Sequence, residues 1–230
     1  MMAGLFPEDN SPVDLLACEE LALRQGYGVI AGVDEAGRGP LAGPVVAAAV
    51  ILPPGLIIPG VNDSKQVTEA MREQLFDVIH REAISVGVGI CDHDAVDRFN
   101  ILQATLKAMR QAVESLTPKP DFILIDGISN IPMNIPQRTV KQGDSRSISI
   151  AAASIIAKVT RDRMMLEYDL QYPGYGFASH KGYAAASHLA AIAELGPSPI
   201  HRKTFSGVKE HLPAPQPGDV PPAGNGSFSF

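Results

Sequence analysis

Four carboxylates stand where apolar, strand-like runs of the sequence end. The runs cover residues 29–33, 122–125 and 138–141, and the acids that follow them are Asp34, Glu35, Asp126 and Asp144. Carboxylates at neighbouring strand ends can converge on one point, where they repel one another and lose hydration. A hard divalent cation relieves both effects. The pattern therefore predicts a site for Mg²⁺ or Mn²⁺, which prefer oxygen ligands.

An ordinary turn explains any one of these acids. Asp126-Gly127 and Gly143-Asp144 are pairs that turns favour, because Asp and Gly both suit tight backbone geometry. A turn role for all four acids together is a weaker explanation, given the motifs that surround them.

The elements that must position these acids follow from hydrophobic periodicity. Residues 29–33 and 45–52 read as buried strands, and the tight turn Gly37-Arg38-Gly39-Pro40 between them predicts a hairpin. Further strands are expected at 84–91, 122–125 and 138–141. Strands that first form a hairpin and then alternate with helices predict an α/β domain with a mixed sheet.

Helices are expected at 11–26, 68–82, 94–116 and 184–195, with a long helix after Asp144. In the helix at 94–116, spacings of three and four put one apolar stripe on a single helix face. Its members are Phe99, Leu102, Leu106, Met109, Val113 and Leu116. In the long helix, the predicted core face carries Ala152, Ile155, Ile156 and Val159.

Composition indicates a cytoplasmic protein with no membrane span. The chain has 230 residues, of which 45% are hydrophobic, and no stretch of about 18 apolar residues occurs. Two cysteines far apart, Cys18 and Cys91, fit a reducing compartment. Residues 1–211 are expected to form the domain. The Pro/Gly-rich residues 212–230 are expected to be a disordered tail, because they cannot bury enough apolar surface.

The charge distribution permits a nucleic-acid partner. The net charge is −6, but basic residues gather in two stretches of the second half. They are Arg138, Lys141, Arg146, Lys158, Arg161 and Arg163, followed by Lys181, Arg202, Lys203 and Lys209. A local basic patch could meet a polyanion while the rest of the surface stays acidic. Lysines and arginines on solvated helix faces explain the same pattern without a partner.

The motifs around the acids resemble those of the ribonuclease HII family. The segment 33–45, Val-Asp-Glu-Ala-Gly-Arg-Gly-Pro-Leu-Ala-Gly-Pro-Val, is similar to the family signature, and the likeness continues to Phe205. The further matching blocks are 62–65, 125–127, 141–144, 152–162, 181–183 and 201–205. The resemblance implies a ribonuclease-H-like fold: a central mixed sheet flanked by helices, with a helical C-terminal portion.

The same resemblance assigns roles to residues. Asp34, Glu35, Asp126 and Asp144 match the family's catalytic acids. Gly37-Arg38-Gly39 and Tyr183 match the elements that sense the 2′-hydroxyl of a ribonucleotide and the following sugar. The implied substrates are RNA–DNA hybrids and DNA duplexes that contain ribonucleotides, which places the enzyme in DNA replication and repair. Cleavage is expected on the 5′ side of the ribonucleotide, leaving 3′-hydroxyl and 5′-phosphate ends.

The expected cofactors are two divalent cations, Mn²⁺ or Mg²⁺. A pair of such ions about 4 Å apart can activate water, neutralise charge and stabilise the leaving oxygen. Asp34 is the expected bridging ligand, and Glu35, Asp126 and Asp144 are the expected flanking ligands.

Three residues are candidates for phosphate contacts. Ser64-Lys65 follows a predicted loop and could grip a backbone phosphate. Lys158 shares a helix face with Arg161 and Asp162, so it could contact phosphate or form a surface ion pair with little effect on stability.

Several further expectations stay open in the sequence. Where the family commonly has a threonine shortly after Tyr183, this chain has Ala184-Ala185, which could alter the grip on substrate. A monomer is expected, and the terminal Phe228-Ser229-Phe230 could dock weakly on a partner protein. The histidines, His201 among them, indicate no metal cluster. The competing functions are another two-metal nuclease or phosphotransferase, and a non-catalytic nucleic-acid-binding module.

Overall fold

A five-stranded mixed sheet forms the centre of the computed structural model, which describes residues 14–61 and 67–213. The strand order is β3-β2-β1-β4-β5. The strands are β1 (Ile30–Ala36), β2 (Val45–Ile51), β3 (Ser85–Cys91), β4 (Phe122–Asp126) and β5 (Gln137–Val140). The fold class expected from the sequence, an α/β domain with a mixed sheet, is confirmed.

The central strands bring two of the acidic strand ends side by side. β1 pairs with β2 antiparallel, as the predicted hairpin requires, and with β4 parallel. Val33 lies opposite Ile125 in the parallel pair, so Asp34 and Asp126 follow at the same edge of the sheet. β5 adds a parallel strand beyond β4.

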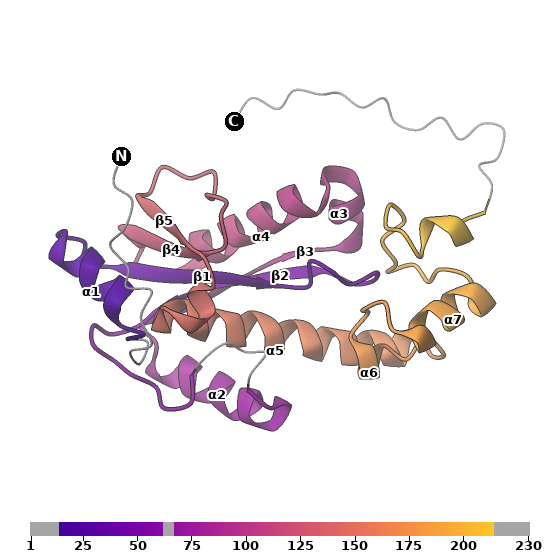
Figure 1. Ribbon diagram of the computed structural model, residues 1–230, viewed down its shortest axis with the longest axis horizontal. Coiled ribbons are helices and arrows are strands. Elements are labelled where there is room, and N and C mark those ends of the chain that lie inside the picture. Colours follow the sequence, from indigo (N-terminus) through magenta and orange to yellow (C-terminus); the bar gives the residue numbers. More distant parts are fainter. Residues whose placement is uncertain (1–13, 62–66, 214–230) are drawn as a thin grey trace.

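Helices cover both faces of the sheet. Figure 1 shows α3 and α4 on one side and α2 and α5 on the other, with α6 and α7 beyond the end of the sheet. The helices are α1 (Ala17–Arg24), α2 (Glu69–Glu82), α3 (His93–Phe99), α4 (Ile101–Ser115), α5 (Ile148–Gln171), α6 (Phe177–His180) and α7 (Ala186–Leu195), with short 3₁₀ turns η1 (Gly143–Ser145) and η2 (Lys209–His211). None of the helices among the described residues is both long and apolar enough to span a membrane.

Two hydrophobic cores lie on the two faces of the sheet. β2 is buried along its whole length, and its residues alternate between the cores. Ala47 and Ala49 face α4, whereas Ala48 and Val50 face α5 and α2. The predicted core face of α5, which includes Ile155 and Ile156, is fully buried as expected.

The single helix predicted from residue 94 to residue 116 is wrong in two respects. The chain breaks at Asn100, whose φ is +68°, and the Asn100 side chain accepts hydrogen bonds from the N–H groups that begin α4. The buried face of α4 is made chiefly of small residues such as Ala108, and Leu102 is left 39% exposed. The helix backbone lies so close to β3 that a methyl group on Gly89 would come within 1.9 Å of the Ala108 carbonyl oxygen.

Other element boundaries shift by a few residues. The start predicted for the first helix at Ser11 lies outside the described residues, and α1 is helical from Ala17. α7 begins at Ala186 rather than Ala184, which leaves Tyr183 in the connection before it. The predicted tail lies almost wholly beyond residue 213, where the described part of the chain ends.

Candidate active site

Asp34 is a buried carboxylate at the end of β1. It is 5% exposed, and burial raises its pKa well above the usual value, with further increases from the charges of Glu35 and Asp126. Hydrogen bonds from the Glu35 N–H, at 2.7 Å, and from the Ser154 side chain oppose this shift. The structure therefore places three of the four predicted acids within electrostatic reach of one another.

Asp144 joins this group through the turn that carries it. The N–H of Gly143 donates to Oδ1 of Asp126 at 2.7 Å, and Asp144 is the next residue, 5% exposed in the short turn η1. This hydrogen bond joins the end of β4, at Asp126, to the turn η1 that carries Asp144.

A divalent cation fits this donor set by charge and by ligand type. A desolvated carboxylate with two acidic neighbours favours a nearby cation, and carboxylate oxygens are suitable ligands for Mg²⁺ or Mn²⁺. As they stand, however, no three or more His, Cys, Asp or Glu side chains among the described residues form a ready metal site. Glu35 instead forms an ion pair with Arg38, with 3.2 Å between Oε1 and Nη1.

The Gly37–Gly39 turn follows the acids and packs against a buried arginine. Arg161, on α5, donates to the carbonyl oxygens of Pro44, Lys181 and Ala42 at 3.0–3.1 Å. Gly37 has a φ of +98°, and a methyl group there would lie 2.2 Å from Arg161 Nε. Only glycine combines this backbone conformation with so close a contact.

Tyr183 lies against the same turn. A methyl group on Gly39 would lie 3.6 Å from Cε1 of Tyr183, and the Arg161 guanidinium lies 6.0 Å from the centre of the tyrosine ring. The ring is 47% exposed, so it offers a face to a ligand. The N–H of Leu41 also donates to the Gly182 carbonyl, which ties the two loops together.

A groove of about 280 Å³ opens beside the acids. It runs between the Glu35–Arg38 pair and α4, and its other wall follows Asp126. Leu102 and the highly exposed Ile128 give it an apolar side. The groove provides space next to the acids for part of an elongated substrate.

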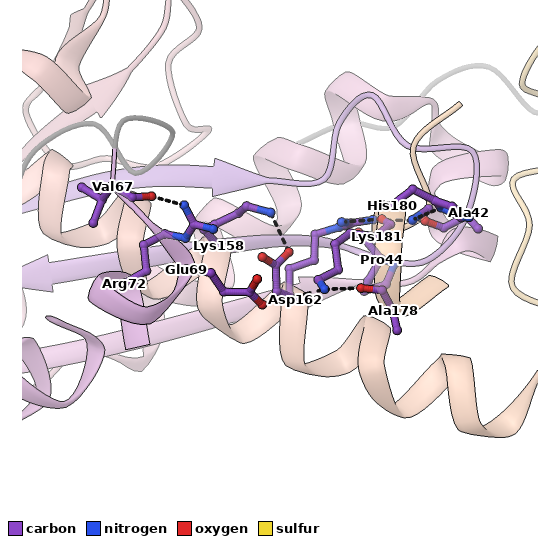
Figure 2. A network of polar contacts seen from close by, with 12 residues as sticks. Ala42, Pro44, Val67, Glu69, Arg72, Lys158, Asp162, Ala178, His180 and Lys181 are labelled. Carbon is purple, nitrogen blue, oxygen red and sulfur yellow. Dashed lines mark hydrogen bonds and ion pairs between the residues drawn. The ribbon is translucent and has the colours of Figure 1, made fainter. Parts of the chain in front are cut away.

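Of the three residues predicted to contact phosphate, the structure describes only Lys158. Lys158 donates to Asp162 at 2.6 Å, as Figure 2 shows. The pair is largely buried rather than on the surface. Burial lowers the pKa of Lys158, and the bond to Asp162 partly offsets this. Ser64 and Lys65 lie outside the described residues.

The basic patch is smaller than the sequence indicates. Arg161 is 1% exposed and Arg202 is 0% exposed, so neither can meet a polyanion at the surface. Burial lowers the pKa of Arg161 to about 10 and that of Arg202 to about 9, which leaves both as cations at neutral pH.

Comparison with known proteins identifies the family. The family model described as "Ribonuclease HII" matches residues 31–208, which include all four acids, the Gly37–Gly39 turn and Tyr183. The chain belongs to the ribonuclease HII family. Ribonuclease HII of Geobacter sp. (strain M21) is 76% identical over 230 residues, which is the full length of both chains.

Solved structures with this fold come from ribonucleases H2 and HIII. The ribonuclease H2 of Pyrococcus horikoshii OT3 aligns with a TM-score of 0.67 and 28% identity, over 80% of this chain and 96% of that one. Bst-RNase HIII in complex with Mn²⁺ aligns with a TM-score of 0.62 and 20% identity, over 90% of this chain and 75% of that one. The second likeness concerns the fold alone.

Membership of the ribonuclease HII family fixes the class of reaction. The chain is a hydrolase, an endoribonuclease that cleaves the RNA strand of RNA–DNA hybrids. This result decides against a non-catalytic binding module and against a nuclease or phosphotransferase of another family.

The contacts of several residues around this ribonuclease HII site were missed by the sequence analysis. Ser154 contacts Asp34, Arg161 and Arg202 hold the loop 37–44, and His188 and His201 lie buried behind Tyr183. Ser154 and Arg161 fall within the matching block 152–162, so their motif was visible but their contacts were not. Nothing in the spacing of His188 and His201 predicts that they meet.

Proposed function

We propose that the chain also cleaves DNA duplexes at embedded ribonucleotides, on the 5′ side, leaving 3′-hydroxyl and 5′-phosphate ends. The observation that carries this proposal is the contact between the Gly37–Gly39 turn and Tyr183 directly beside Asp34 and Glu35. Only the 2′-hydroxyl distinguishes a ribonucleotide from its neighbours, so a selective enzyme needs a sugar-reading surface next to the reacting phosphate.

We further propose that the four acids hold two divalent cations, Mn²⁺ or Mg²⁺. Asp34 would be the shared ligand because it is buried and the charges of both Glu35 and Asp126 act on it. Glu35, Asp126 and Asp144 would complete the set. The ions would supply an activated water, neutralisation of the phosphate charge and stabilisation of the leaving oxygen.

The residues around the acids prepare this site. Ser154 donates to Asp34 and favours its charged form. Arg38 neutralises Glu35 in the free protein, and because its side chain is 52% exposed it can swing from Glu35 to a phosphate oxygen of the substrate. Gly143 orients one oxygen of Asp126, which leaves the other oxygen available as a ligand.

The sugar is read by the turn and by the tyrosine. Arg38 and Gly39 are exposed, so their main-chain groups can approach the ribose at the cleavage point. The exposed face of Tyr183 would pack on the next sugar, and its hydroxyl would anchor that nucleotide. Ser64, Lys65 and Lys158 remain proposed phosphate contacts, and for Lys158 such a contact would compete with its bond to Asp162.

Other proposals concern the whole protein. We propose a cytoplasmic monomer whose catalytic domain spans residues 1–211, with residues 212–230 as a separate tail. Docking of a partner protein on Phe228-Ser229-Phe230 remains a prediction about residues outside the described part.

Tyr183→Ala tests the proposed reading of the sugar. We expect it to lose most cleavage of a duplex with one ribonucleotide and to lose less on a long RNA–DNA hybrid, where many other contacts remain. Tyr183→Phe is the matched control, because it keeps the ring and removes only the hydroxyl. Metal-induced thermal stabilisation should be unchanged in both variants. Equal, wild-type cleavage of both substrates by Tyr183→Ala would show that the ring does not read the sugar.

A further inference from the structure

Arg202 is an arginine whose hydrogen bonds all end on the loop that contains the Gly37–Gly39 turn. It is fully buried, and its five hydrogen bonds reach the carbonyl oxygens of Gly37, Arg38, Pro40 and Gly43 at 2.6–3.1 Å. The segment around it is also paired with the loop: the Arg202 N–H donates to the Leu41 carbonyl at 2.8 Å. A buried charge is thus balanced by main-chain dipoles.

These bonds determine which way the turn's peptide groups point. In a trans peptide, the carbonyl of one residue and the N–H of the next point in opposite directions. Arg202 draws the carbonyls of Gly37 and Arg38 inward, so the N–H groups of Arg38 and Gly39 point outward. Within the described residues, neither N–H has a hydrogen-bond partner, and both residues are exposed. Two free donors therefore face away from Arg202, on a turn whose Gly39 lies close to the Tyr183 ring.

His201, the residue before Arg202, is linked to the Tyr183 backbone through a second buried histidine, His188. His201 Nε2 lies 3.0 Å from His188 Nε2, and His188 Nδ1 lies 2.8 Å from the Tyr183 carbonyl oxygen. Ser198 donates its N–H to His201 Nδ1 at 2.8 Å. Both histidines are 0% exposed.

These contacts assign one tautomer to each ring. A carbonyl oxygen only accepts, so His188 Nδ1 carries a proton and its Nε2 accepts. His201 Nδ1 accepts from Ser198, so its Nε2 carries the proton and donates to His188. The chain of bonds therefore runs in one direction, from Ser198 through both rings to Tyr183.

We propose that His201-Arg202 positions both halves of the sugar-reading surface: Arg202 aims the N–H groups of Arg38 and Gly39, and His201, through His188, holds the Tyr183 backbone. Neither side chain touches substrate, so these are positioning residues. The proposal rests on the proposed function, since it assumes that the turn and Tyr183 meet the ribose.

Binding without catalysis tests the role of Arg202. Fluorescence anisotropy in EDTA would measure the dissociation constants for a DNA duplex with one ribonucleotide and for the same duplex made only of DNA. We expect the wild type to prefer the first by about tenfold, the effect of one or two good hydrogen bonds. Arg202→Lys cannot reach four carbonyls from one ammonium group. It should lose this preference while its affinity for the all-DNA duplex stays within about twofold.

The controls separate positioning from general stability. Val113→Ala, a cavity variant in the core beneath α4, should lower the melting temperature and keep the wild-type preference. If Arg202→Lys is folded by circular dichroism and retains the full preference, the proposal is wrong. If the wild type shows no preference at all, the proposed reading of the sugar fails first, and the positioning role fails with it.

A second pair of variants tests the role of the two histidines separately from Arg202→Lys. His188→Asn keeps an N–H near the Nδ1 position for the Tyr183 carbonyl, whereas His188→Leu removes it at similar volume. We expect His188→Asn to retain most of the preference for the ribonucleotide and His188→Leu to lose it. Equal preference in the two variants would show that His188 only fills space and would overturn the role given to His201.

Discussion

Asp126 shows why the acids of this site need a cation. Its charge is one of those that raise the pKa of the buried Asp34, so the metal-free site holds repelling groups at neutral pH. Binding of a divalent ion would convert that repulsion into ligation. The acids can then be costly for stability and necessary for activity at the same time.

Asp126→Asn separates these two effects. The amide is nearly isosteric and can still accept the N–H of Gly143, but it removes one negative charge from the site. We expect turnover with Mg²⁺ to fall by roughly 100-fold or more, and the melting temperature in EDTA to hold or rise. Steady-state kinetics and thermal melts measure both. Near-wild-type turnover would show that Asp126 is not a metal ligand.

His201 makes stability depend on pH in a predictable direction. Burial, with further contributions from His188 and the more distant His93 and His180, lowers its pKa to about 4. The unfolded chain has a histidine pKa near 6.5 and so binds more protons as pH falls below that value. The stabilisation is therefore fully present above about pH 6.5 and is lost progressively as pH falls towards 4.

We expect His201 to account for about 2 kcal/mol of lost unfolding free energy between pH 7 and pH 5. Denaturant unfolding at both pH values would measure the loss, and His201→Gln, which cannot titrate, should show a correspondingly smaller loss. Identical pH dependence in the two proteins would contradict the depressed pKa.

Among single residues, the acids could be predicted and the buried cations could not. Asp34 and Asp126 each end an apolar run, and that signal survives into the fold because parallel strands share an edge. Arg202 carries no such signal. Arginine is nearly always exposed, so its complete burial depends on carbonyls contributed by a loop 159–165 residues away in the chain, and no local pattern records that.

At the scale of elements, periodicity located the strands and helices better than their breaks. The hairpin of β1 and β2 follows the expected pattern because the residues of a strand alternate between the two faces of the sheet. The core face of α5 follows it because that face packs on the sheet. The break between α3 and α4 was missed because spacings of three and four continue across Asn100. There, backbone conformation and an N-cap outweigh the apolar stripe.

Asn100 offers a test of that explanation. Asn100→Ala removes the side-chain cap of α4 and, like asparagine, leaves a residue with a Cβ at a φ of +68°. We expect a loss of about 1–2 kcal/mol in unfolding free energy. Asn100→Gly, which accepts positive φ, should lose clearly less. Equal losses would mean that the backbone conformation contributes nothing to the break. Catalytic activity should be unaffected in both variants.

In the molecule as a whole, the residues of the proposed site and those that position them come from both ends of the described chain. The acids and the turn lie on β1 and at the ends of β4 and β5, whereas Tyr183, His188 and Arg202 belong to the C-terminal elements near α6 and α7 in Figure 1. The order of these residues in the sequence does not show that the two groups lie together. The family resemblance supplied Tyr183, but the contacts that hold it there required the structure.

The C-terminal segment gives a further prediction at this scale. Residues 212–230 are rich in proline and glycine and nearly uncharged, so we expect them to add little to the core. Deleting residues 212–230 should leave the melting temperature and the cleavage rate almost unchanged. A clear drop in melting temperature on truncation would contradict that expectation.

We propose above all that this site recognises a single ribonucleotide by its sugar and cuts beside it. The most direct measurement is cleavage, with Mg²⁺ or Mn²⁺, of a labelled DNA duplex that contains one ribonucleotide, with both new ends mapped. We expect one cut on the 5′ side of the ribonucleotide, leaving 3′-hydroxyl and 5′-phosphate ends, and no comparable cleavage of the same duplex made only of DNA. Cleavage of the all-DNA duplex at a similar rate, or a cut elsewhere in the strand, would contradict the account.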